Sequence, residues 1–102
     1  MEIIKVTKDT FEEEVLKSKR VLIDFNADWC GPCRMLSPIL EEVAKKEENT
    51  KIVSINIDEE EDLAVDYSVF SIPCLVLLED GKEVKRHVGF LPKEEIEKLI
   101  GE

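Results

Sequence analysis

The residues most able to do chemistry in this sequence are the two cysteines of the segment Trp29-Cys30-Gly31-Pro32-Cys33. Residues three apart on a helix lie about one turn from each other on the same face, which puts these thiols within disulfide reach. The continuous apolar run 21–25 precedes them, and apolar residues at helical spacing follow them. The pattern predicts a redox-active dithiol where a buried strand gives way to a helix.

The two thiols are expected to differ. The first turn of a helix has N–H groups without partners and a partial positive charge, so the thiolate of Cys30 is stabilised there and reacts first. Cys33 lies one turn further in, and we expect it to be the more buried, resolving thiol. Gly31 lets a partner approach the backbone, and Pro32 has no N–H to lose at this position. Trp29 offers a flat apolar face beside the nucleophile.

Structural thiols and a metal site are the alternatives. The chain has three cysteines, an odd number that does not suit a secreted domain held together by disulfides. Zinc normally takes four ligands, yet a second C-x-x-C or an H-x-x-x-H is absent, and only Cys74 and His87 remain. Redox chemistry is therefore favoured over metal binding.

The elements that must position the dithiol alternate along the chain. Strands are expected at 2–6, 21–25, 51–57, 74–78 and 83–88, and helices after Thr10, over 33–46, through 63–67 and from Pro92. The segment Thr10-Phe11-Glu12-Glu13 has the form of a capping box. Parallel strands joined by crossovers, followed by a hairpin, predict an α/β fold with a mixed sheet between helices, and residues 1–102 form one domain.

Composition limits the partners. The net charge of −10 argues against nucleic acid and anionic membrane surfaces, which bind clustered Lys and Arg. No apolar run approaches the roughly 20 residues that cross a bilayer, and the first residues lack the pattern of a signal peptide. We therefore expect a cytoplasmic protein.

The motifs together resemble the thioredoxin family. The matching residues occur in the family's order and spacing over nearly the whole chain: Asp24-Phe25-x-Ala27-x-Trp29-Cys30-Gly31-Pro32-Cys33, Pro38, Ser71-Ile72-Pro73, Asp80-Gly81 and Val88-Gly89. The resemblance implies a thioredoxin fold, in which a mixed five-stranded sheet is flanked by four helices. It also implies a general protein disulfide reductase that needs no cofactor. A thioredoxin reductase, which carries the FAD and uses NADPH, would recycle its Cys30–Cys33 disulfide, and we expect a monomer.

Asp24 is a single acid inside the apolar run 21–25. Burial raises the pKa of a carboxyl, which suits Asp24 to proton transfer near neutral pH. The resemblance places Asp24 behind Cys33, as the base that deprotonates the resolving thiol. Many relatives carry a buried lysine on the third strand, where this chain has Ser54, so we expect a higher pKa for Asp24 than in those relatives.

A substrate-binding rim is expected around the dithiol. The resemblance implies a cis peptide bond before Pro73, which would leave the backbone of Ile72 free to pair with an extended substrate segment. Gly89, Phe90 and Phe70 are expected to join Trp29 and Ile72 in an apolar surface for protein substrates.

Cys74 stands where the family commonly has threonine. We favour a small buried strand residue, because an unpaired cysteine behaves as a small hydrophobe. The alternative is a regulatory thiol near the dithiol.

Two other functions use the same motifs. One is an oxidant or isomerase of disulfides, although the Gly-Pro pair between the cysteines resembles the reducing branch of the family. The other is a binding subunit that uses the fold as a scaffold.

Overall fold

The computed structural model describes residues 1–101. Five strands and four helical segments follow one another along the chain: β1 (Ile4–Lys5), η1 (Glu12–Leu16), β2 (Arg20–Asn26), α1 (Gly31–Lys46), β3 (Lys51–Asn56), α2 (Glu61–Asp66), β4 (Cys74–Glu79), β5 (Lys82–Val88) and α3 (Lys93–Gly101). This order agrees with the expected alternation, and it confirms a mixed sheet flanked by four helical segments.

The strands form one sheet in the order β1-β3-β2-β4-β5. β2 lies at its centre, paired in parallel with β3 and antiparallel with β4. The five inner residues of β2 are all buried, as expected for a strand covered on both faces. β2 leads directly into the segment that carries the two cysteines, so the central strand of the sheet positions the dithiol.

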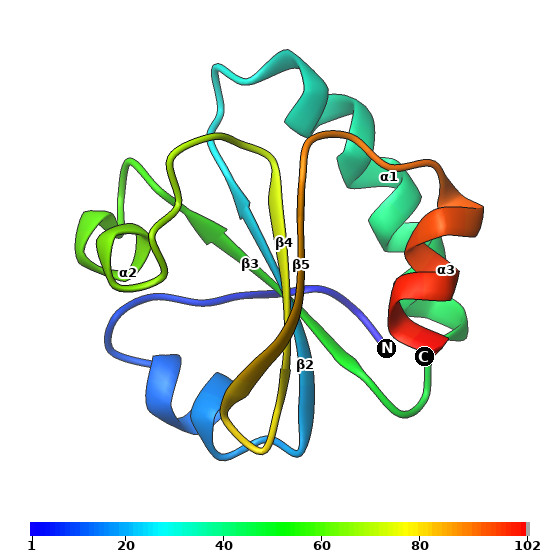
Figure 1. Ribbon diagram of the computed structural model, residues 1–102, viewed down its shortest axis with the longest axis horizontal. Helices are drawn as coiled ribbons and strands as arrows, with labels where there is room; N and C mark the ends of the chain where they lie inside the picture. Colours follow the sequence, from blue (N-terminus) through cyan, green and yellow to red (C-terminus); the bar gives the residue numbers. More distant parts are fainter. Residues whose placement is uncertain (102) are drawn as a thin grey trace.

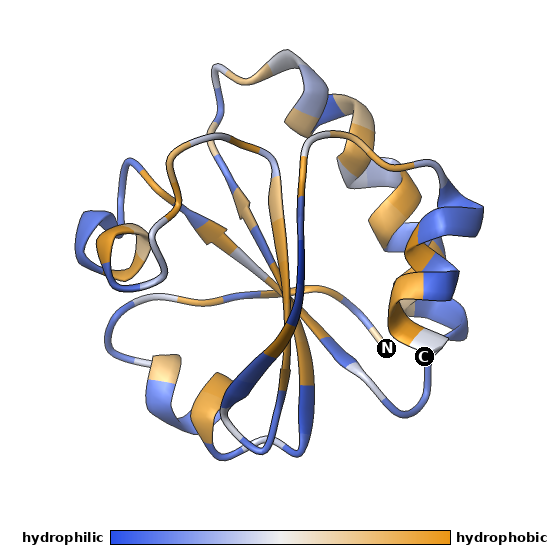
Figure 2. Ribbon diagram, viewed as in Figure 1, coloured by the Kyte–Doolittle hydropathy of each residue, from blue (hydrophilic) through white to orange (hydrophobic). Residues whose placement is uncertain are grey.

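Helices cover both faces of the sheet. α1 and α3 lie on one side, and η1 and α2 lie on the other (Figure 1). Side chains alternate along β2, so Leu22 packs under α1 and α3 while Ile23 and Phe25 join the core on the opposite face. Figure 2 shows β4 as mostly hydrophobic, the edge strand β5 as mostly hydrophilic, and hydrophilic residues on the outward sides of the helices. Each fully buried Leu or Ile side chain contributes roughly 1.5–3 kcal/mol to this core.

The start of the chain differs from expectation. β1 is two residues long rather than five, because it pairs with β3 only through Ile4 and Lys5. The predicted capping box at Thr10 does not form. Instead, the Thr10 hydroxyl accepts a hydrogen bond from the backbone N–H of Thr7, 3.0 Å away. Phe11 takes the cap position of η1 and makes no side-chain capping bond.

The hairpin between β4 and β5 forms where the sequence predicts it. Asp80 and Gly81 connect the two strands, and both have positive φ angles, 51° and 80°. Such a turn matches the twist of the flanking strands and favours an Asp-Gly pair, because glycine adopts positive φ at no steric cost.

Candidate active site

The dithiol lies where β2 gives way to α1. Cys30 and Cys33 form a disulfide, with Cα atoms 5.2 Å apart. Cys30 is the N-cap residue of α1, and its sulfur accepts a hydrogen bond from the backbone N–H of Cys33 at 3.2 Å. Pro32 follows within the first helical turn, where a missing N–H costs nothing. A Cβ added at Gly31 would meet no atom within 4 Å, so a partner can approach the backbone from this side.

The expected difference in burial between the two cysteines is wrong for the disulfide form. Cys30 is 4% exposed and Cys33 is 5% exposed. Both pack in a small apolar cluster with Ala27, against Ile57 and Ile72. Ile57 and Ile72, from the segments after β3 and before β4, help to cover this cluster.

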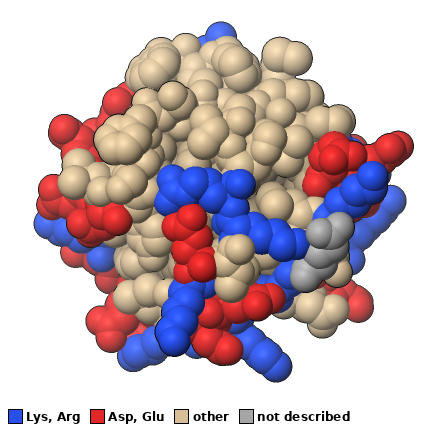
Figure 3. Space-filling model, in the orientation of Figure 1, with Lys and Arg blue, Asp and Glu red and all other residues tan. Residues whose placement is uncertain are grey.

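Three loops meet around this cluster. The loop before α1 carries Trp29, the loop before β4 carries Phe70 and Ile72, and the loop after β5 carries Gly89 and Phe90. Phe70 is 93% exposed and Trp29 is 66% exposed. The end of the molecule formed by these loops is largely free of charged side chains, which gather lower down and at the sides (Figure 3). The predicted rim residues are thus brought together at one end of the sheet.

Trp29 is held in place by a contact that the sequence did not reveal. Its indole Nε1 donates a hydrogen bond to the carboxylate of Asp58 at 2.8 Å. The side-chain oxygen of Asn56 in turn accepts hydrogen bonds from the backbone N–H groups of Asp58 and Glu59. The loop after β3 therefore fixes the orientation of an exposed aromatic ring beside the disulfide.

The peptide bond between Ile72 and Pro73 is cis, as the resemblance implied. The carbonyl of Pro73 accepts a hydrogen bond from the backbone N–H of Gly89 at 2.7 Å. Gly89 has a φ of 104°, a conformation that residues with a Cβ rarely adopt. Glycine at this position thus lets the end of β5 turn and join the loop that carries Ile72.

Asp24 is buried beneath the dithiol. It is 6% exposed, and it lies on the face of the sheet that α1 covers. Burial raises the pKa of its carboxyl to about 6, and a hydrogen bond from Asn26 opposes this rise. The expected direction of the pKa change is confirmed, and the group can exchange a proton close to neutral pH.

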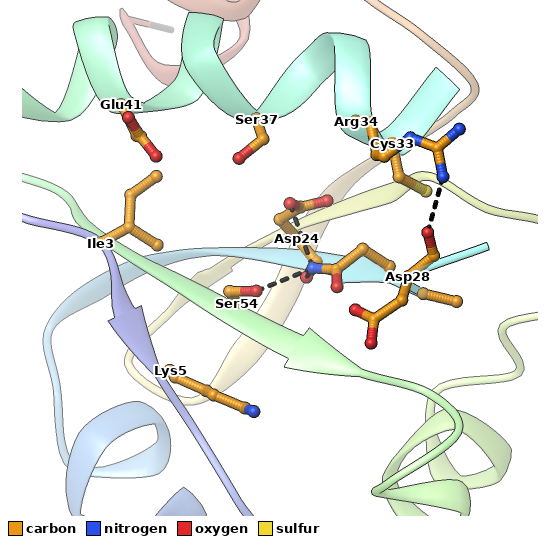
Figure 4. A pocket seen from close by; sticks show the side chains of 11 residues that line it. Ile3, Lys5, Asp24, Asp28, Cys33, Arg34, Ser37, Glu41 and Ser54 are labelled. Atoms are coloured by element: carbon orange, nitrogen blue, oxygen red, sulfur yellow. Dashed lines mark hydrogen bonds between the residues drawn. The ribbon is translucent and has the colours of Figure 1, made fainter. Parts of the chain in front are cut away.

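Asp24 lines a pocket with a volume of about 460 Å³. It lies between α1 and the β1–β3–β2 side of the sheet, and Figure 4 shows the side chains that line it. Cys33, Ser37 and Glu41 face it from successive turns of α1. Ser54 lines it from β3, where it is the register partner of Asp24. The dithiol therefore has an apolar surface on one side and a polar pocket on the other.

Cys74 is a free, fully buried thiol at the start of β4. It packs in the core under η1 and α2 rather than in the cluster that holds the disulfide. Burial raises the pKa of this thiol, and the guanidinium of Arg86 lies 3.7 Å from its sulfur. This position agrees with the small buried strand residue that the sequence favoured.

Within residues 1–101, no three or more His, Cys, Asp or Glu side chains are grouped so that they could hold a metal ion. No helix in this part of the chain has the length and apolar character needed to span a bilayer.

Comparisons with known proteins decide the family. The model of the family described as Thioredoxin matches residues 2–102. The chain belongs to the thioredoxin family. It is 45% identical to thioredoxin from Bacillus subtilis over 101 residues, which cover 98% of this chain and 96% of the relative. It is 46% identical over 95 residues to thioredoxin from Chlamydia trachomatis, with 93% and 92% of the two chains covered.

Among solved structures, a mutant thioredoxin from Halobacterium salinarum superposes with a TM-score of 0.90 at 36% identity. The superposition covers 97% of this chain and 88% of that one. Together with the Cys30–Cys33 disulfide, membership of this family identifies a protein-disulfide oxidoreductase that acts by thiol–disulfide exchange. Proteins of this family use their own dithiol, need no cofactor, and interact with thioredoxin reductase and disulfide-containing proteins.

Proposed function

We propose that Cys30 is the attacking thiol and Cys33 the resolving thiol of a general protein disulfide reductase. The observation that carries this assignment is the position of Cys30 as the N-cap of α1, with its sulfur bonded to the Cys33 N–H. A thiolate formed there keeps this hydrogen bond and faces the positive end of a 16-residue helix. Cys33 lies inside the first turn and lines the pocket that holds Asp24.

The proposed cycle begins when the Cys30 thiolate attacks a target disulfide and forms a mixed disulfide. Asp24 then accepts the proton of the Cys33 thiol, and the Cys33 thiolate attacks the sulfur of Cys30 and releases the reduced target. An acid with a pKa of about 6 is mostly ionised at neutral pH and can therefore accept a proton. Because this pKa lies close to neutral pH, the acid can also release the proton again. Asp24 is therefore assigned the role of proton shuttle.

The substrate is assigned to the end of the molecule that carries the apolar rim. Phe70, Phe90 and Trp29 supply exposed apolar surface there, and the turn at Gly89 brings Phe90 to it. Ile72 packs against the disulfide cluster directly before β4, so its backbone is placed to pair with an extended segment of the target. A broad, mainly apolar surface suits many targets, which supports a general reductant.

Reduction of insulin tests the assignment of the thiols. Cys30→Ser and Cys33→Ser should abolish catalysed reduction when a thioredoxin reductase supplies electrons, and the matched Cys74→Ser variant should retain it. Activity of Cys30→Ser equal to that of the wild type would contradict the proposal. A reduction potential of about −120 mV, measured against glutathione, would instead indicate an oxidant.

The setting of this activity is also a proposal. A cytoplasmic monomer suits a protein whose dithiol must be kept reduced between cycles. The net charge of −10 does not suit binding to nucleic acid or to an anionic membrane.

A further inference from the structure

Asn26, the last residue of β2, bonds to Asp24 in two places. Its side-chain Nδ2 donates hydrogen bonds to the backbone carbonyl of Asp24 at 2.9 Å and to Asp24 Oδ2 at 3.3 Å. The same nitrogen donates to the Ser54 hydroxyl on β3 at 2.8 Å. An amide nitrogen carries only two hydrogens, so these three acceptors engage all of its donor capacity and fix its orientation.

The two oxygens of the Asp24 carboxyl are consequently unequal. Oδ2 accepts from Asn26, whereas Oδ1 is buried and has no hydrogen-bond partner among the residues that the structure describes. A buried acceptor without a donor costs free energy, and such groups call for an explanation in function. Asp24 and Cys33 line the same pocket, and Figure 4 shows the Asp24 carboxyl facing α1 between Ser37 and Cys33.

The strand register makes this arrangement possible. Asp24 and Ser54 are partners in the parallel pair β2–β3, and Asn26 lies two residues further on the same face as Asp24. A side chain at position 26 can therefore reach back to Asp24 and sideways to residue 54. The short serine side chain lets the amide lie between the two strands.

We propose that Asn26, oriented by Ser54, is a positioning residue that holds Asp24 Oδ2 and leaves Oδ1 as the oxygen that accepts the proton of Cys33. The inference rests on the proposed role of Asp24 as proton shuttle. It adds which oxygen of the Asp24 carboxyl accepts the proton and what orients that carboxyl. Asn26 itself transfers no proton and touches no sulfur in this account.

The step balances within the protein and its target. Oδ1 takes the proton from the Cys33 sulfur. An electron pair of the resulting Cys33 thiolate then forms the bond to the Cys30 sulfur. The bond between Cys30 and the target sulfur breaks, and its electron pair leaves with the target as a thiolate, which takes up a proton from water. The proton on Oδ1 then leaves through the pocket to solvent, which restores the Asp24 carboxylate.

The hydrogen bond from Asn26 also stabilises the charged form of Asp24, so its removal should raise the pKa of this carboxyl further. Asn26→Leu keeps a similar size without the amide, and Asn26→Val offers a second variant that suits a strand. Thr50→Val is the matched control, because it removes a partly buried hydrogen bond from Arg20 at the other end of the sheet. All four proteins can be compared in the disulfide form, in which Cys30 and Cys33 do not titrate.

The first measurement is the titration of the Asp24 carboxyl by carbon-13 NMR. The wild type and Thr50→Val should titrate near pH 6, and both Asn26 variants should titrate about one pH unit higher. The second measurement is the rate at which the reduced protein releases its target from the mixed disulfide, followed by rapid acid quench and mass spectrometry. At pH 6 the Asn26 variants should release the target roughly fivefold more slowly, and at pH 9 at the wild-type rate.

A wild-type titration in both Asn26 variants would overturn the inference, as would a raised titration with an unchanged pH profile of release. The role of Asp24 is tested separately by Asp24→Asn. If Asp24→Asn releases the target as fast as the wild type at every pH, the proposed shuttle fails. If Asp24→Asn is slow but the Asn26 variants behave as wild type, only the positioning role fails.

Discussion

The two sides of the Cys30–Cys33 disulfide differ in almost every physical property. On one side lies the mainly apolar end of the molecule, with Phe70 and Trp29 exposed to solvent. On the other lies the polar pocket, with the buried carboxyl of Asp24 in its wall. In the proposed cycle a protein target and a proton must both reach the sulfur atoms, and we propose that each does so from its own side.

The two sides also differ in their origin along the chain. The apolar rim is assembled from three loops, whereas Asp24, Asn26 and Ser54 lie on two central strands held by the sheet register. Loops tolerate varied partners, while proton transfer needs atoms fixed within hydrogen-bond reach. We infer that the rim can adapt to targets without disturbing the geometry of the proton pathway.

The largest effect is expected from removing the buried acid. The folded protein binds the Asp24 proton more tightly than the unfolded chain, so this group favours folding most below pH 4, and that advantage is lost as the pH rises through about 6. Relative to wild type, Asp24→Asn should therefore gain about 2 kcal/mol in free energy of unfolding between pH 4 and pH 8. Urea unfolding at the two pH values measures the difference.

Asp9→Asn is the control for this experiment, because Asp9 is an exposed acid. Its stability should follow the wild type at both pH values. An Asp24→Asn variant with the same pH dependence as the wild type would show that burial does not penalise the Asp24 carboxylate.

A smaller effect is expected when a further cation is placed beside Asp24. Ser54→Lys introduces the lysine that many relatives carry on this strand, and the pocket beside Ser54 has room for the side chain. An ammonium group near Asp24 should lower its pKa by about one pH unit or more, which carboxyl NMR would detect. An unchanged or raised pKa would mean that the pocket hydrates the lysine and isolates it from Asp24.

Much of this site could be predicted from the sequence. The C-x-x-C spacing placed the dithiol at the start of a helix, and the apolar run 21–25 placed Asp24 in the interior. Matching motifs also implied the cis bond before Pro73. These features depend on neighbours in sequence or on patterns that the family shares.

Other features depend on contacts between distant segments. The equal burial of Cys30 and Cys33 involves residues that are distant in the sequence, Ile57 and Ile72. The contact between Asn26 and Ser54 follows from the register of two parallel strands, and a sequence does not display that register. The bond between Trp29 and Asp58 is hidden for the same reason.

The central claim is that substrate and proton reach the dithiol from different sides. Single-turnover kinetics at pH 8 with a disulfide-containing protein can separate the two, because mixed-disulfide formation depends on target concentration and release does not. We predict that Phe70→Ser slows formation several-fold and leaves release unchanged. Asp24→Asn should slow release by roughly a hundredfold and leave formation unchanged. If both variants slow the same step, the division of the site into two sides is contradicted.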